Sequence, residues 1–231
     1  MKLSRIKVGI DSPSAAGAGT IAKMLAFHYN LNQLDTGKIY RYLAKKLMLE
    51  KPKNKIKYLK KISKKIDLKK LKSKSLLNDE VAHVASQIAK DLRVRKLVVK
   101  FQRNLAYNPP KKFRGSILDG RDINSKIVKD ADFKFYITAS STCRAKRRVA
   151  ELRQLGKKVK FNEILKSMKK RDREDRTRKH SRLKKTKESY LINTTNLSIK
   201  SSFLKVKKIM DRKLNKYERN YKREKFKTYR I

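Results

Sequence analysis

The chain has 231 residues and carries 66 Lys and Arg against 20 Asp and Glu, a formal net charge of +46. This length suits one sizeable α/β domain or two small ones. The charge indicates a polyanionic partner, such as a nucleotide or a nucleic acid. Compositional drift in an AT-rich genome is the alternative explanation, because the basic residues are spread over every segment.

Several other classes of site are excluded or disfavoured by composition. A single cysteine, Cys143, excludes an internal disulfide and a cysteine-ligated metal site, and three scattered histidines argue against a histidine cluster. The first residues lack the apolar run of a signal peptide, and no window approaches the roughly 18 apolar residues of a membrane span. We therefore expect a reduced, cytoplasmic protein with no membrane partner.

The N-terminal segment predicts a strand, a turn and a helix. Ile6, Val8 and Ile10 alternate in "RIKVGID", and "DSPSAAGAGT" follows before apolar residues recur at helical spacing. Phosphate-binding loops of the form G-x-x-x-x-G-K occur in this context, because their backbone N–H groups and the helix N-terminus face the phosphate. Here Ala18 replaces the lysine. The loop alone is a weak signal, and a tight strand-to-helix connection is the alternative.

The middle of the chain is mostly helical in pattern. A short strand "NQLD" ends at Asp35 and runs into "TGKIYRYLAKKLML". Residues 50–76, rich in Lys, Ile and Leu, predict one amphipathic helix and a solvated connection. Asn78 suits the N-cap of the next helix, and "DLRVRKLVVKFQRNLAY" predicts another that stops at Pro109 and Pro110.

Three further strands are predicted in "GSILDGRD", "FKFYITAS" and "SYLIN", with a closing helix after the last. Strands that alternate with helices indicate an α/β fold: a five-stranded parallel sheet with helices on both faces. Ligands of such sheets gather at the carboxyl ends of the strands. The polar motifs "DTG", "DGRD" and "TASS" each follow an apolar run directly, so we expect them at that edge.

One helical segment, "FNEILKSMKKRDREDRTRKH", changes character along a single face. This face carries Phe161, Ile164, Leu165 and Met168 and continues with Arg171, Asp172, Asp175 and Arg178. A stripe that turns from apolar to charged without a break in spacing predicts a helix that enters the site of a polyanionic ligand. An ordinary salt-bridged surface helix is the alternative.

A second basic cluster follows the fourth predicted strand, in "STCRAKRRVAELR". Arg144, Arg148 and Glu151 share a helical face there. Arginine suits phosphate because its guanidinium group contacts two oxygens at once. For Arg147 and Arg153 we favour a solvated face.

Six motifs stand in order along nearly the whole chain: "IDSPSAAGAGT", "LDTGKIYR", "VASQIAKDLRVR", "LDGRD", "ADFKFYITASSTCRAKRR" and "RDREDRTR". Together they resemble the bacterial cytidylate (CMP/dCMP) kinases, P-loop nucleoside monophosphate kinases of the adenylate-kinase-like fold. The resemblance implies a single kinase domain over 1–231. Its core would comprise 1–35, 104–150 and 180–231, its NMP-binding insert 36–103, and its lid 151–179.

The resemblance also implies the reaction: transfer of the γ-phosphoryl group of ATP to CMP or dCMP, giving ADP and CDP or dCDP. Mg²⁺ would arrive with ATP and have no direct protein site of its own. A monomer is expected. The ATP phosphates would lie on the turn formed by Ser12, Pro13, Ser14, Ala15, Ala16, Gly17, Ala18, Gly19 and Thr20.

The remaining site residues also follow from the resemblance. Residues implied to bind CMP are Thr36, Tyr40, Arg41, Ser86, Arg95, Arg121, Asp122, Arg171, Asp175 and Arg178. Within this set Thr36, Arg41 and Arg121 would hold the nucleotide phosphate, and Ser86, Arg95 and Asp122 would read the cytosine edge. Arg171 and Asp175 would contact the sugar, and Arg178 the phosphates. The implied catalytic residues are Asp35, which would organise the acceptor phosphate and magnesium, and the lid arginines Arg144, Arg148 and Arg176.

The loop departs from the family pattern at three positions, Ser12, Ala15 and Ala18. Loss of one donor to the transferring group costs about 10²–10³ in rate, and a lid arginine could replace part of it. We expect Ala18→Lys to raise turnover, unless another residue now provides the charge. Three alternatives stay open: a nucleotide-binding pseudo-kinase, a kinase for UMP or a purine monophosphate, and a nucleic-acid-binding protein, which the charge permits but the motifs do not favour.

Overall fold

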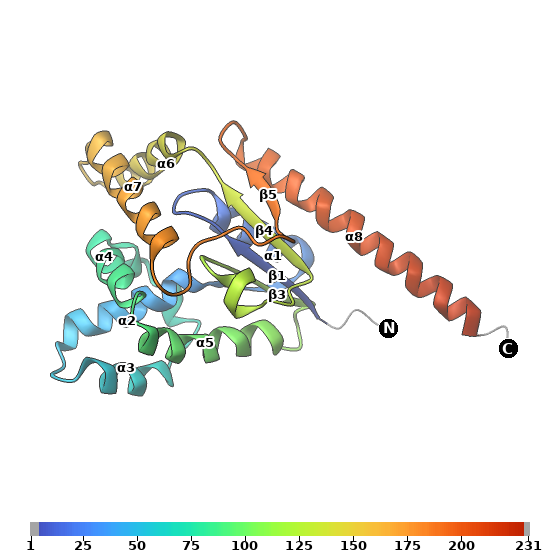
Figure 1. Cartoon of the computed structure of the whole chain (residues 1–231), viewed down its shortest axis with the longest axis horizontal. Helices are drawn as coiled ribbons and strands as arrows, with labels where there is room; N and C mark the ends of the chain where they lie inside the picture. The colour runs from blue at the N-terminus through green and yellow to red at the C-terminus, as the bar shows by residue number, and fades with distance from the viewer. Residues whose placement is uncertain (1–4, 229–231) are drawn as a thin grey trace.

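The computed structural model describes the backbone of residues 5–228 and the side chains of residues 5–216 other than 72, 74 and 79. Five parallel strands form one sheet in the order β2-β3-β1-β4-β5 (Figure 1). The strands are β1 (Ile6–Asp11), β2 (Leu31–Asp35), β3 (Gly115–Gly120), β4 (Phe133–Thr138) and β5 (Tyr190–Asn193). The predicted five-stranded parallel sheet is confirmed.

Helices cover both faces of the sheet, as predicted (Figure 1). One face packs against α1 (Ala18–Tyr29) and α8 (Ile199–Thr228), and the other against α2 (Thr36–Glu50) and α5 (Leu92–Tyr107). Successive residues of β3 show this division, because side chains alternate along a strand. Both Ile117 and Leu118 are buried. Ile117 packs in the apolar cluster with α1 and α8, and Leu118 packs in the cluster with α2 and α5.

Residues 50–91 form α3 (Lys55–Ser63), two short 3₁₀ turns, η1 (Lys70–Lys72) and η2 (Lys74–Leu77), and α4 (Asp79–Ile88). The predicted cap is confirmed: Asn78 Oδ1 accepts a hydrogen bond from the N–H of Glu80 at 2.9 Å. The prediction of a solvated connection was wrong for Leu71 and Leu76, which are buried against α2 and its neighbours. They provide apolar anchors for a segment that otherwise consists largely of lysine and serine.

Two helices stand over the carboxyl ends of the strands. They are α6 (Ser141–Gln154) and α7 (Phe161–Thr177), and they pack against each other beside α4 (Figure 1). A short π-helix, η3 (Ile123–Ile127), follows β3. Within the part of the chain that the structure describes, no helix combines the length and apolar character needed to cross a membrane.

Candidate active site

The carboxyl ends of β1, β2 and β3 open into one cavity of about 340 Å³, a size typical of small-molecule sites. The predicted site residues that line it are Ser12, Pro13, Ser14, Ala15, Ala16, Gly17, Ala18, Gly19, Thr20, Asp35, Thr36, Tyr40, Arg41, Ser86, Arg95, Arg121, Asp122, Arg148, Arg171, Asp175 and Arg178. Arg144 and Arg176 do not line it. They border a separate depression between α6 and α7.

The turn 11–20 has the backbone of a phosphate loop. Ala15 and Gly17 adopt left-handed conformations, with φ of +58° and +89°. Glycine adopts this left-handed conformation without steric strain, whereas an L-residue such as Ala15 is destabilised in it by roughly 1–2 kcal/mol. Contacts with other elements hold the loop: for example, the Ser12 N–H donates to the Gly120 carbonyl, and Thr194 Oγ1 donates to the Ala16 carbonyl, both at 3.0 Å. The substitutions in the loop have not changed its shape into an ordinary turn.

The first residue of α1 provides no cation at this loop. Ala18 is buried and packs in the apolar cluster of α1 and β1. Arg147, which the sequence placed on a solvated face, instead donates to Thr194 Oγ1 at 3.0 Å and to the Thr194 carbonyl at 2.7 Å. That prediction was wrong, because the chain after β5 folds back onto α6 and offers these acceptors. Arg153 is exposed, as predicted.

The side of the cavity opposite the loop contains a buried ion pair. Arg95 Nη2 lies 2.6 Å from Asp122 Oδ2, and the two side chains are 5% and 6% exposed. Arg95 also donates to Ser181 Oγ and to the Ala89 carbonyl, each at 2.9 Å. A buried pair needs such additional hydrogen bonds to offset its desolvation. The network fixes the Asp122 carboxylate at the cavity wall.

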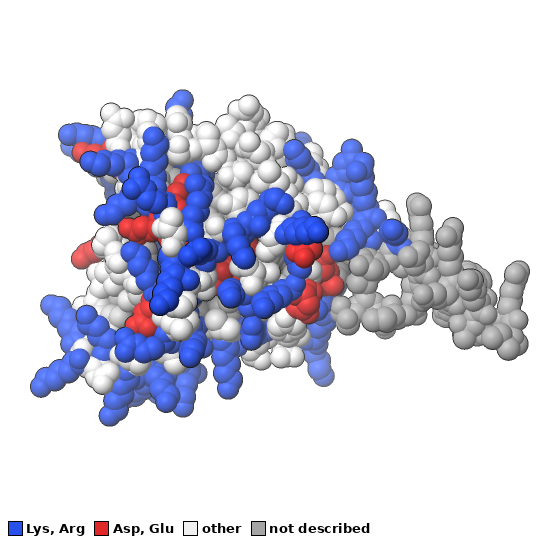
Figure 2. Space-filling view, in the orientation of Figure 1, with Lys and Arg blue, Asp and Glu red and all other residues white. Residues whose placement is uncertain are grey.

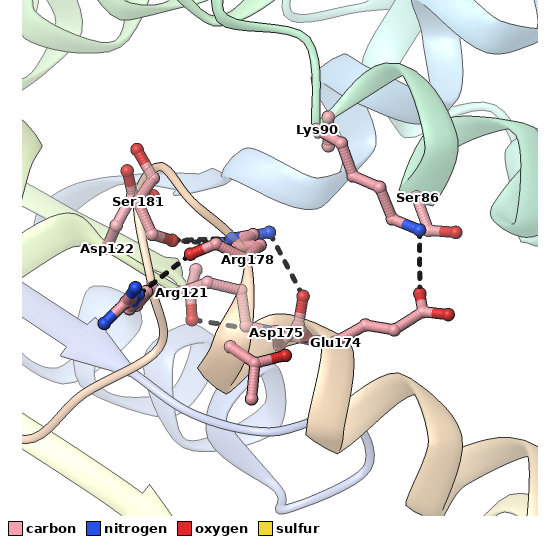
Figure 3. Close-up of polar contacts among 12 residues, drawn as sticks. Ser86, Lys90, Arg121, Asp122, Glu174, Asp175, Arg178 and Ser181 are labelled. Atoms are coloured by element: carbon pink, nitrogen blue, oxygen red, sulfur yellow. Dashed lines mark hydrogen bonds and ion pairs between the residues drawn. The ribbon is translucent and has the colours of Figure 1, made fainter.

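A second ion-pair group follows from α7 (Figure 3). The Asp175 carboxylate accepts from Arg121 Nε at 2.9 Å and from Arg178 Nη1 at 3.1 Å. Burial acts to raise the pKa of Asp175, but the charges of Arg121 and Arg178 hold it below its ordinary value. Arg178 Nε donates to the Ser181 carbonyl at 2.7 Å. Of the predicted charged stripe, Arg171, Asp175 and Arg178 line the cavity, whereas Asp172 borders the depression between α6 and α7.

Side chains join α6 to the phosphate loop and α7 to the connection between α4 and α5. Arg144 is buried and donates to Asp172 Oδ1 at 3.2 Å and to the Ser14 carbonyl at 3.1 Å. Lys90 of the α4–α5 connection lies 3.0 Å from Glu174 of α7 (Figure 3). The Arg144 side chain therefore contacts the backbone of the phosphate loop, although Arg144 lies outside the cavity.

Three polar atoms at the cavity are buried and have no hydrogen-bond partner among the described residues: Tyr40 Oη, Asp119 Oδ1 and Arg171 Nε. Burial raises the pKa of Tyr40 to about 12, and burial with the Arg121 charge lowers the pKa of Arg171 to about 10. Buried polar groups in proteins are almost always paired. Three unpaired groups on one cavity indicate that a polar ligand completes them.

Asp119 is a residue that the sequence prediction missed, although it stands in the quoted motif "LDGRD". It pairs in register with Asp35 across β2 and β3, and Thr36 Oγ1 donates to its carbonyl at 2.8 Å. Burial and the Asp35 charge raise the pKa of Asp119, while Arg121 and Lys38 oppose the shift. Lys38, which follows "DTG", also lines the cavity and was likewise missed. Asp119 lies at the carboxyl end of β3, and Lys38 lies three residues after the end of β2. Position near the carboxyl end of a strand is the signal that could have found both.

On the face drawn in Figure 2, Lys and Arg side chains are widespread, with Asp and Glu among them, and no single basic patch stands apart on that face. Among the residues that the structure describes, no group of three His, Cys, Asp or Glu side chains could hold a metal ion. The cavity is therefore the strongest candidate for a site.

Comparison with known proteins agrees with this geometry. The family model "Cytidylate kinase" matches residues 8–212. The cytidylate kinase of Bartonella tribocorum is 41% identical over 201 residues, covering 85% of this chain and 90% of the relative. That of Mesorhizobium japonicum is 38% identical over 205 residues, covering 88% and 93%.

A solved structure supports the fold alone. An uncharacterized protein from Eubacterium ventriosum matches with a TM-score of 0.52 at 18% identity, covering 90% of this chain and 99% of that one. The family model and the two curated relatives cover most of the chain, including the cavity and its loop. The chain belongs to the cytidylate kinase family.

Proposed function

We propose that this protein transfers the γ-phosphoryl group of ATP to CMP or dCMP, giving ADP and CDP or dCDP. The observation that carries the proposal is the single cavity where a phosphate loop meets three unpartnered buried polar groups, in a chain of the cytidylate kinase family. The loop and the polar groups lie on different elements. This arrangement suits a phosphoryl donor and a phosphoryl acceptor that meet between them.

At the donor end, backbone N–H groups from Ser14 to Thr20 would hold the ATP phosphates, helped by the N-terminus of α1. The adjacent carboxylates of Asp35 and Asp119 suit Mg²⁺, which prefers oxygen ligands and keeps several waters. Mg²⁺ would neutralise charge on the phosphates. Because Asp119 Oδ1 lacks a partner, it fits a metal-bound water.

At the acceptor end, Arg41, Arg121 and Thr36 would hold the CMP phosphate. The exocyclic amine of cytosine would donate a hydrogen bond to the Asp122 carboxylate. Ser86 and Arg95 would donate hydrogen bonds to the ring nitrogen and the carbonyl oxygen of cytosine. Arg95 already fixes the Asp122 carboxylate. We propose that Arg171 and Asp175 contact the sugar of CMP and that Tyr40 contacts the same nucleotide.

Catalysis would consist of positioning and charge neutralisation. An oxygen of the CMP phosphate attacks the γ-phosphorus, and the bond to the β-phosphate oxygen breaks with ADP as the leaving group. The acceptor is already an anion, so no general base is needed. Arg148 would neutralise the transferring group, and Arg144 of α6 already contacts the loop at the Ser14 carbonyl. Arg176 stands on α7 and would act only after α7 moves toward the loop.

We further propose the division into a core of 1–35, 104–150 and 180–231, an insert of 36–103 and a lid of 151–179, in a monomeric enzyme. The boundaries at 103 and 150 fall inside α5 and α6, so these helices would carry motion from the core to the mobile parts. The lid-to-insert pair Lys90–Glu174 joins the two parts that would close on CMP.

A coupled ADP-release assay with CMP, dCMP, UMP and AMP tests the proposal. We expect turnover with CMP and dCMP, and an Asp122→Asn variant that loses the preference for CMP over UMP. Loss of a buried acceptor costs about 10²-fold in such discrimination. Equal turnover of UMP or AMP by the unmodified protein would favour another acceptor.

Two further outcomes identify the other functions. CMP binding without turnover of any acceptor would favour a pseudo-kinase. Nucleic-acid affinity that falls steeply with salt and persists at saturating ATP and CMP would favour a nucleic-acid-binding protein.

A further inference from the structure

The phosphate loop lacks its cation at Ala18, yet the cavity provides one from a neighbouring element. We propose that Lys38, at the start of α2, supplies the positive charge at the β- and γ-phosphates that a loop lysine otherwise supplies. This inference rests on the proposed phosphoryl transfer, because it assigns a catalytic role within the same cavity.

The backbone places Lys38 at the same edge of the sheet as the loop. Asp35 caps α2, and its Oδ1 accepts from the Gly37 N–H at 3.0 Å, so Lys38 lies in the first turn. Asp35 pairs in register with Asp119. The Asp119 carboxylate in turn approaches the loop, with Oδ2 3.7 Å from where a Cβ on Gly19 would stand.

The Lys38 side chain lines the cavity together with Gly17, Ala18 and Gly19. A lysine has four carbons between its backbone and its charge. Because Lys38 lines the same cavity as these loop residues, its long side chain can direct the ammonium group toward phosphates held there.

The other cations of the cavity are arginines, and several are committed elsewhere. Arg95 pairs with Asp122, and Arg121 and Arg178 pair with Asp175. Among the described residues that line the cavity, Lys38 is the one lysine. Its ammonium group makes no hydrogen bond or ion pair with a described residue. An ammonium group is a compact point charge with three donors, as the loop lysine of this fold is. Lys38 thus matches the missing group in chemistry as well as in place.

The expected effect follows from where the charge acts. A cation at the bridging and γ-oxygens stabilises the charge that develops on transfer more than it stabilises bound CMP. Removal of Lys38 should therefore lower kcat and leave the KM for CMP nearly unchanged. A residue that only supports the start of α2 would instead change the KM for CMP, because Thr36, Tyr40 and Arg41 stand on that helix.

The test is a cycle of four proteins: unmodified, Lys38→Ala, Ala18→Lys, and the double variant. We expect Lys38→Ala to lower kcat by about 10²-fold, with the KM for CMP within about threefold. Ala18→Lys should raise kcat at least tenfold in the Lys38→Ala background. In the unmodified protein it should raise kcat by a smaller factor. Lys38→Arg should retain intermediate activity. Lys46→Ala, on the same helix but paired with Glu50 outside the cavity, is the matched control and should change nothing.

Calorimetry supplies a readout that needs no turnover. Lys38→Ala should weaken ATP binding about tenfold and AMP binding little, because only ATP carries the β- and γ-phosphates. Equal effects on ATP and AMP, or an Ala18→Lys gain of the same size with and without Lys38, would overturn the inference. If the unmodified protein makes no CDP, the proposed reaction fails, and the ATP-to-AMP comparison still decides whether Lys38 meets the phosphates.

Discussion

The two ends of the cavity are built differently. At the acceptor end, Arg95, Asp122, Arg121, Asp175 and Arg178 hold one another in ion pairs, so each side chain has a fixed direction. At the donor end, the loop relies on backbone N–H groups, which every loop residue except Pro13 provides. The loop therefore keeps its backbone conformation with Ser12, Ala15 and Ala18 in place, although Ala18 brings no side-chain charge. A backbone site depends on conformation, whereas a side-chain network depends on the identity of every member.

Arg121→Ala should have the largest effect, because it removes a proposed phosphate ligand and a partner of Asp175 together. We expect kcat/KM for CMP to fall by about 10³-fold, the upper range for a lost donor to a phosphoryl group. Steady-state kinetics with varied CMP measures it. Arg153→Ala, an exposed arginine outside the cavity, is the control. A loss below tenfold would show that the acceptor phosphate binds elsewhere.

Arg144→Ala tests the link between the donor loop and the lid. It leaves the Asp172 carboxylate buried without its partner and frees the Ser14 carbonyl. We expect the free energy of unfolding to fall by about 3–5 kcal/mol. Urea denaturation measures it, with Asp172→Asn for comparison. A change below about 1 kcal/mol would mean that water already reaches this pair.

Asp11, which precedes the loop, should make stability depend on pH. Burial raises its pKa to about 7, although its carboxylate accepts from the N–H groups of Ile123 and Asn124. The folded state then keeps a proton that the unfolded state releases near pH 4, so stability falls as pH rises from about 4 to about 7.

The size of this loss is about 4 kcal/mol at most, from the difference between the two pKa values. Urea titrations at several pH values measure it. Asp11→Asn removes the titration and should flatten this part of the profile. Parallel profiles for the two proteins would assign the pH dependence to other groups.

Lys90→Ala should have the smallest effect. Its ion pair with Glu174 is partly exposed, and such pairs contribute about 0–1 kcal/mol. We expect less than a threefold rise in the KM for CMP, and a smaller rise at high salt. A tenfold rise would show that insert and lid close through this contact and not through CMP itself.

The sequence predicted the fold better than it predicted the contacts. Short apolar runs, alternating in the first strand, predicted the five strands, and Asn78 predicted a helix start, because both signals are local. Arg147 and Lys38 were misjudged or missed, because what a side chain meets depends on elements far away in the chain. Arg147 finds Thr194 only after β5 returns to α6. Lys38 lies beside the loop only because β2 pairs with β3.

The leucines of the 3₁₀ turns illustrate the same limit. Leu71 and Leu76 stand in a lysine-rich segment whose composition is typical of solvated connections, yet both are buried. Their burial depends on the space between α2 and its neighbours, which no local pattern reports. The acceptor residues were named from the family motifs, and their roles stay predictions until kinetics tests them.

The most direct test of phosphoryl transfer in this cavity is ³¹P NMR of the purified, unmodified protein with ATP, Mg²⁺ and CMP. The account predicts that ATP and CMP signals fall together while ADP and CDP appear in equal amounts. Inorganic phosphate with CMP unchanged, or no reaction at all, would contradict it.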